Sequence, residues 1–125
     1  MDNAEQPVRA VAAGRLAFCG SHDGLPADGS VVGSVPEQVG IALDRLDETL
    51  AKLQVDLTAV RQMSVYLIDL EREAEVRALI GDRLSSNVAI TVLPVSAIGS
   101  ERGGKPSVAV DAVAELKVEQ NTEIC

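Results

Sequence analysis

The sequence predicts an α+β domain with the element order ββαβαββ, in which two helices pack on one face of a sheet. Three observations support this fold class. Apolar residues recur at three- and four-residue steps over 35–53, alternate with period two over 60–68, and form a β-branched run over 87–93. With 125 residues, of which 46% are hydrophobic and 24% charged, the chain is expected to fold around one core as a single domain, 1–125.

The N-terminal segment is expected to form a β-hairpin. Residues 8–11 and 16–19 are short and mostly apolar, and the Ala-Gly-Arg sequence at 13–15 suits a tight turn between them. Residues 20–33 then carry four glycines, a proline and several aspartates, a composition that favours a loop. Long irregular segments in small domains are often functional, so this loop is expected to carry site residues.

Capping and periodicity predict two helices. Ser34 and Glu37 match a capping box, so the first helix is expected to begin there. Its apolar stripe consists of residues three or four positions apart, namely Val39, Ala42, Leu46, Leu50 and Leu53. Asp69 can cap a second helix over 70–80, which Gly81 is expected to end.

Three further strands complete the predicted sheet. The first covers 60–68, the second covers 87–93 and ends at a proline, and the third covers 107–116 and closes the sheet. The core is expected to extend over about 7–118. Residues 119–125 are then expected to be a polar tail or a frayed strand.

The last predicted strand is apolar on both sides. One side consists of Val108, Val110, Ala112 and Ala114, and the other of Ala109, Asp111 and Val113. Two helices can cover only one face of the sheet, so association with copies of the same chain is expected to cover the second.

Charge and composition argue against nucleic acid as the principal partner. Nineteen acidic and eleven basic residues give a net charge of −8, which a phosphate backbone would repel. One Phe, one Tyr and no Trp leave no aromatic stacking platform. The apolar stretches are far shorter than the roughly 20 residues that span a bilayer, and the polar N-terminus shows no secretory signal. We therefore expect a cytoplasmic, soluble protein with a small-molecule ligand and no membrane partner.

Several strings of the sequence, in this order, resemble the Rid (YjgF/YER057c/UK114) family. They are AVAAGRLAF at 10–18, VYLIDL at 65–70, LP at 93–94 and VAVDAVA at 108–114. The resemblance implies a chorismate-mutase-like fold and a homotrimer with inward-facing sheets and a ligand cleft at each subunit interface. It also implies hydrolysis of a reactive enamine or imine to a keto acid and ammonia, and no cofactor is expected.

The family's site residues are carried over only in part. In the family an Arg at the start of the penultimate strand holds the substrate carboxylate, but Ser85 stands at that place and Arg83 could reach the same pocket. A family Glu that positions water corresponds to Asp111. The backbone N–H that assists would come from the segment matched to Gly20-Ser21-His22 or, after a one-residue shift, to Cys19-Gly20-Ser21.

Two further differences concern the edges of the cleft. A family Tyr near the N-terminus corresponds to Pro7, and the connection between Pro94 and Ser107 is longer than in the family, so it could cover or reshape the cleft. Tyr66, on the more polar face of its strand, could line the cleft or pack in the centre of the trimer.

Asp111 and His22 are the candidate catalytic residues. A carboxylate within an apolar strand is costly to bury, so Asp111 is either catalytic or paired with an Arg across an interface. His22 follows a predicted strand end, where it could act as general acid or base or be an exposed loop histidine.

The remaining candidates each have a structural alternative. Cys19 could be a nucleophile or a buried apolar residue, and Cys125 is expected to be an exposed thiol without a role. Arg83 could hold an anion or complement the dipole at the end of the second helix. No metal is expected, because His22 has only Asp23 and Asp28 as nearby ligands.

The sequence therefore leads to two hypotheses. In the first, Asp111 activates water while His22 or nearby backbone polarises an imine, enamine or related carbonyl compound. Loss of the carboxylate-binding Arg indicates a substrate other than a simple 2-imino acid. In the second, the same fold is a non-catalytic module that binds a small molecule or a partner.

Overall fold

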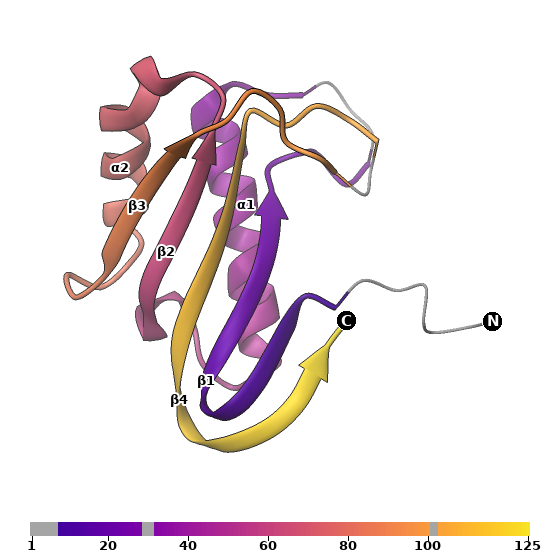
Figure 1. Cartoon of the computed structure of the whole chain (residues 1–125), viewed down its shortest axis with the longest axis vertical. Coiled ribbons are helices and arrows are strands. Elements are labelled where there is room, and N and C mark those ends of the chain that lie inside the picture. The colour runs from indigo at the N-terminus through magenta and orange to yellow at the C-terminus, as the bar shows by residue number, and fades with distance from the viewer. Residues whose placement is uncertain (1–7, 29–31, 101–102) are drawn as a thin grey trace.

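The computed structural model describes residues 8–28, 32–100 and 103–125. The elements are the strands and helices β1 (Ala10–Asp23), α1 (Val35–Ala51), β2 (Val60–Leu67), α2 (Glu73–Gly81), β3 (Ala89–Pro94) and β4 (Val108–Ile124), with short 3₁₀ helices η2 (Leu57–Ala59) and η3 (Leu70–Arg72) before β2 and α2. The sheet has the order β1-β4-β2-β3, with β4 antiparallel to both neighbours and β3 parallel to β2. Both helices lie on one face (Figure 1), which confirms the predicted α+β class.

The two strands predicted at the N-terminus are the halves of one bent strand, β1. The chain reverses where the turn was predicted, at Gly14, whose φ of 64° favours glycine. Residues 10–14 pair with 120–124, and residues 16–23 pair with 109–115. Because the two predicted strands are one, the order is βαβαββ rather than ββαβαββ. β4 is long enough to follow β1 around its bend and pair with both halves (Figure 1).

Residues 119–125, predicted to be a polar tail or a frayed strand, lie mostly within β4. Ile124 pairs with Ala10 and packs against the core, and its carbonyl accepts a hydrogen bond of 2.5 Å from the Arg9 N–H. The Gln120 side-chain amide donates to the Leu53 carbonyl at 3.1 Å. The end of the chain is thus fastened to both the sheet and the end of α1.

The predicted helix capping is confirmed for α1. The Ser34 hydroxyl accepts a hydrogen bond from the Glu37 N–H at 3.3 Å and donates to the Glu37 carboxylate at 3.2 Å. The apolar stripe of α1 faces the sheet. Its five members are each at most 1% exposed, namely Val39, Ala42, Leu46, Leu50 and Leu53. The predicted second helix starts as η3, where Asp69 accepts from the Glu71 N–H, and continues as α2.

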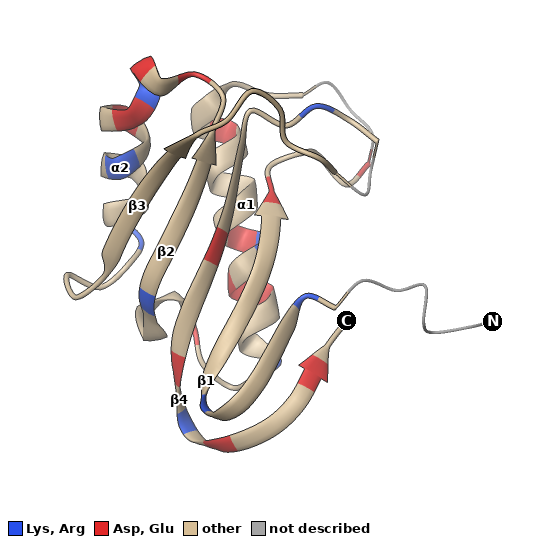
Figure 2. Ribbon diagram, viewed as in Figure 1, with Lys and Arg blue, Asp and Glu red and all other residues tan. Residues whose placement is uncertain are grey.

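The faces of the sheet alternate as predicted. Met63, Val65 and Leu67 of β2 are fully buried beneath the helices. On the opposite face, which we call the open face, Leu16 and Phe18 of β1 are 42% and 48% exposed. Figure 2 shows few charged residues along the middle of the sheet. In the part of the chain that the structure describes, no helix combines the length and the apolar character needed to cross a membrane.

A close backbone approach fixes the segment after β1 against α1. A Cβ atom on Gly24 would collide with the Gln38 carbonyl oxygen and would lie 2.5 Å from the Gln38 Cα. Only glycine fits here without a shift of the backbone. The contact holds the end of β1 beside the first turns of α1. The segment just before β4 is anchored at the same place, because the Ser107 N–H donates to the Gln38 side chain.

We predict that Gly24→Ala lowers the free energy of unfolding by about 1–3 kcal/mol, because the added methyl group overpacks a rigid backbone contact. Gly40→Ala is the matched control, since Gly40 is a helical glycine of α1 with open space around its Cα. That change is expected to raise stability by about 0.5–1 kcal/mol through helix propensity. Urea unfolding of both variants measures the difference, and equal stability of Gly24→Ala and the parent chain would contradict the contact.

Candidate functional site

A pocket of about 250 Å³ lies on the open face. Its floor is formed by Ala109 and Asp111 of β4 and by Tyr66 of β2, and Ser21 of β1 lies at its side. The rest of its lining comes from the connection between β3 and β4, through Val95, Ala97, Ile98 and Gly99. The pocket thus brings together four segments that are far apart in the sequence.

Asp111 and Tyr66 form the polar centre of this pocket. Asp111 is half-buried in the middle of β4, opposite Ser64 of β2. The Tyr66 hydroxyl donates a hydrogen bond to the Asp111 Oδ2 at 2.7 Å. This bond, with burial and the negative charge of Asp111 adding to it, raises the pKa of Tyr66, so the phenol stays protonated as the donor. The carboxylate is therefore held in one orientation within an otherwise apolar wall.

The long connection between Pro94 and Ser107 is fastened at both ends. The Val95 N–H donates to the Leu67 carbonyl at 3.1 Å, and the Ile68 N–H donates to the Ser107 carbonyl at 3.1 Å. The buried Gln38 side chain of α1 accepts from the Ser107 N–H at 2.8 Å. The position of the connection over Ala109, which is 0% exposed, supports the expectation that it covers part of the cleft.

His22 does not lie with Asp111. It belongs to β1 rather than to the predicted loop, and only 3% of it is exposed. Its Nδ1 lies 2.6 Å from the Gly20 carbonyl, and its Nε2 lies 2.8 Å from the Thr49 Oγ1 of α1. Burial is the main cause that lowers the pKa of His22. His22, expected in a loop either as a catalytic residue or as an exposed side chain, is thus a buried strand residue on the helix side of the sheet.

A β-bulge explains this position of His22. Cys19 pairs with Ala112 and His22 pairs with Val110, so the step between these two pairs is three residues in β1 but only two in β4. Each extra residue in a strand moves the following side chains to the other face. Strict alternation would have placed His22 on the face of Phe18, whereas the bulge turns Ser21 to the pocket and His22 to α1.

Cys19 and Gly20 are close to the pocket but do not line it. Cys19 is 4% exposed in the core, and burial, with a smaller effect of the Asp111 charge, raises its pKa to about 11. A thiol with that pKa is not a nucleophile at neutral pH, so the buried alternative fits. The Gly20 N–H donates to the Arg9 carbonyl at 2.7 Å, so it is already engaged within the bent β1.

Arg83 and Ser85 also lie outside the pocket. Arg83 forms a salt bridge of 2.8 Å with Asp44 of α1 and donates to the Gly40 carbonyl at 3.4 Å. The Ser85 Oγ is buried and has no hydrogen-bond partner. Among the described residues, no Lys or Arg lines the pocket, and no group of three or more His, Cys, Asp or Glu side chains could hold a metal. Pro7 lies outside the described residues.

The pocket residues of the connection were not predicted individually. Val95, Ala97 and Ile98 are ordinary apolar residues, and the only signal in the sequence was the length and glycine content of the segment that contains them. Thr49 was likewise missed, because nothing in the helical pattern marks a threonine that contacts a histidine 27 residues earlier.

Comparison with known proteins places the fold. No family model matches the sequence, and no curated protein matches it. Solved structures do match. A Mycobacterium tuberculosis member of the YjgF/YER057c/UK114 family is 21% identical, with a TM-score of 0.74 over 91% of this chain and 90% of that one. Yeast Mmf1 is 16% identical, with a TM-score of 0.78 over 90% and 89% of the two chains.

Escherichia coli TdcF, whose structure was solved with bound serine, is 14% identical, with a TM-score of 0.73 over 86% of this chain and 85% of that one. At such identities the likeness is one of fold. It agrees with the motifs at 10–18, 65–70, 93–94 and 108–114 that resemble the same family. The chain therefore has the fold of the Rid (YjgF/YER057c/UK114) family.

Proposed function

We propose that this protein is a Rid-type enzyme that hydrolyses an imine or enamine in the pocket formed by Asp111 and Tyr66. The observation that carries the proposal is the hydrogen bond of 2.7 Å between these two side chains, which orients a half-buried carboxylate toward a pocket of about 250 Å³. The bound serine of E. coli TdcF supports a small nitrogen-containing ligand for a protein of this fold.

The charge of the pocket points to the substrate class. Among the described residues, Asp111 is the only charged residue of the lining, and none of them supplies a cation that would hold a carboxylate. An anionic 2-imino acid would be repelled here, whereas a neutral enamine or a protonated iminium would be favoured by the carboxylate. The substrate class proposed is therefore an enamine or iminium compound without a carboxylate beside the reacting carbon.

The chemistry needs one base and one water molecule. A neutral enamine first takes a proton from solvent water on its β-carbon and so becomes an iminium. Asp111 then accepts a proton from water as the water oxygen adds to the iminium carbon, and the π electrons of the C=N bond move to nitrogen. The proton on Asp111 then passes to the nitrogen of the carbinolamine. The C–N bond breaks with its electrons on the departing ammonia, while the Asp111 carboxylate takes the hydroxyl proton and passes it to the ammonia. The products are a carbonyl compound and ammonium. Tyr66 is a positioning residue that holds the carboxylate through its hydroxyl.

The proposed active form is a homotrimer. The exposed Leu16 and Phe18 lie on the open face, where a single chain leaves apolar surface in water. Association of three copies through this face would bury these side chains and enclose the pocket, which in one chain is open on its outer side.

A non-catalytic module that binds a small molecule is the second candidate. The observation that favours it is the position of His22, which leaves Asp111 and Tyr66 as the only titratable side chains that line the pocket in the described chain. In this case the pocket would bind its ligand through the same two side chains without turnover.

We predict that Asp111→Asn lowers ammonia release from freshly generated neutral enamines by about 100-fold or more, because the amide cannot accept the proton from water. Glu115→Gln is the matched control, since Glu115 lies on the same strand outside the pocket and is expected to retain full activity. Unchanged turnover in Asp111→Asn would contradict the enzymatic role. No turnover by the parent chain, together with ligand binding that Asp111→Asn abolishes, would favour the binding module.

We also predict that light scattering gives the mass of three chains for the parent protein and a smaller mass for Phe18→Asp, because a carboxylate on the open face opposes its burial. Leu70→Asp is the control, since Leu70 is 46% exposed in η3, outside the sheet, and the change should leave the trimer intact. A parent chain that is monomeric at micromolar concentration is the result that would overturn the trimer.

A further inference from the structure

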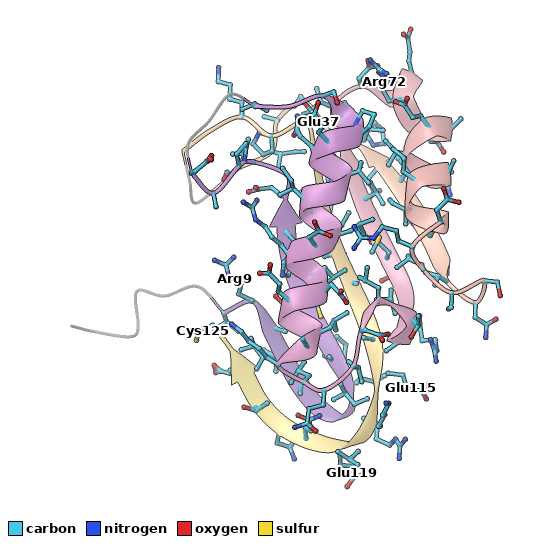
Figure 3. The ribbon with its side chains drawn as sticks, turned by 180° about the vertical axis from the view of Figure 1, so that it is seen from behind. Arg9, Glu37, Arg72, Glu115, Glu119 and Cys125 are labelled. Atoms are coloured by element: carbon cyan, nitrogen blue, oxygen red, sulfur yellow. The ribbon has the colours of Figure 1, made fainter. Side chains whose placement is uncertain are left out.

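A second cavity, of about 220 Å³, lies on the helix side of the sheet. Its walls come from the segment before β1, the end of β1 and the last turns of α1. Arg9 lies beside α1 at this place (Figure 3). The other charged residues of the lining are Arg45, Glu48 and Lys52, which α1 and its C-cap contribute. His22 and Thr49 complete the polar lining.

The charge of this cavity is opposite to that of the chain. Of the residues that the structure describes, three cations and one carboxylate line it, whereas the whole chain has a net charge of −8. Asp23 offsets part of this charge, because it forms a salt bridge of 3.1 Å with Arg45. A concave site with an excess of cations attracts anions, and a partly buried one does so more strongly than an exposed surface.

The hydrogen bonds of His22 leave room for one more proton. The Gly20 carbonyl can only accept, so Nδ1 carries a hydrogen and donates to it at 2.6 Å. The Thr49 Oγ1 lies 2.8 Å from the His22 Nε2 and 3.2 Å from the Arg45 carbonyl, but it has only one hydrogen to donate. When Nε2 is also protonated, it donates to Thr49, and Thr49 donates to the Arg45 carbonyl, so all three bonds form.

The groups around His22 control whether that proton binds. Burial lowers the pKa of His22, and the charges of Arg9 and Arg45 lower it further, while the Gly20 carbonyl and the Asp23 carboxylate act in the opposite direction. Glu48 and Lys52 of α1 also line the cavity. An anion between these cations would offset their repulsion and favour the imidazolium.

We propose that this cavity binds a small oxyanion, the carboxylate or phosphate group of a metabolite, and that binding brings a proton onto His22. The site is distinct from the Asp111 pocket, because it lies on the other face of the sheet and shares no lining residue with that pocket. It goes beyond the proposed hydrolysis and does not depend on it. By linkage, the oxyanion and the proton each strengthen the binding of the other by the same factor.

His22 is the only histidine of the chain, so its imidazole NMR signals in the untagged protein report this site alone. The pH titration is recorded with sodium sulfate, which stays fully ionised over the range, and with sodium chloride at equal ionic strength. We expect sulfate to raise the pKa of His22, and sulfate to bind about fivefold or more tightly near about pH 5.5 than near about pH 8. A titration that is the same in both salts would overturn the proposal.

Lys52→Gln and Arg9→Gln are expected to weaken sulfate binding and to reduce the shift of the His22 pKa. Lys105→Gln is the matched control, because it removes an exposed cation that does not line the cavity. Lys52 is exposed at the C-cap of α1, so its substitution is expected to leave the fold intact even if that of Arg9 does not. Equal losses in Lys52→Gln and Lys105→Gln would show a general charge effect and contradict a defined site.

Two further titrations identify the anion. Inorganic phosphate and malonate, both titrated near about pH 5.5 where anion binding is expected to be strongest, represent the phosphate and the carboxylate groups, and the stronger binder indicates the source. Asp111→Asn is expected to retain the sulfate response, so failure of the hydrolysis proposal leaves this one testable. Loss of the response in Asp111→Asn, with the fold intact, would contradict two independent sites.

Discussion

The pairing of β4 with both β1 and β2 is the constraint on which the rest of the structure depends. β4 follows β1 through its bend and lies between β1 and β2 in the sheet. This places Asp111 at the centre of the molecule, with a strand on each side, where a carboxylate is expensive unless it has a hydrogen-bond donor. Tyr66, across the strand boundary in β2, supplies that donor. The pocket is therefore a consequence of the register between β4 and β2.

The bulge in β1 divides the polar residues between the two faces of the sheet. Ser21 lies at the Asp111 pocket, and His22, the next residue, lies at the cavity beneath α1. One extra residue in the strand thus separates a site with a single carboxylate from a site with an excess of cations. The separation is short, since the charge of Asp111 contributes to the raised pKa of Cys19 on the helix side. Asp111 is not among the charges that shift the pKa of His22, so the sheet keeps the two sites chemically distinct.

The sequence predicted the elements whose periodicity and caps are local. The stripe of α1, the cap at Ser34 and the buried face of β2 follow from neighbouring residues. The bulge could not be predicted, because its register is set by pairing with β4 and a strict alternation puts His22 on the wrong face. The same holds for residues 119–124, whose polar composition resembles a tail until β1 provides a partner. Asp111 could be singled out from the sequence because a carboxylate in an apolar strand conflicts with its surroundings. The apolar residues of the connection could not be singled out, because nothing about them conflicts with their surroundings.

The position of Arg83 outside the Asp111 pocket has a structural basis in α1. Arg83, the nearest candidate in sequence, is held by Asp44 and the Gly40 carbonyl on the helix layer, so reaching the open face would require it to break both contacts. Ser85, which the resemblance matches to the family Arg, has a short side chain with a buried hydroxyl and cannot replace a guanidinium. Among the described residues, no cation that lines the pocket therefore compensates the charge of Asp111. Under the proposed hydrolysis, such a carboxylate would favour a substrate with its own positive charge, such as an iminium, over an imine whose positive charge is offset by a carboxylate.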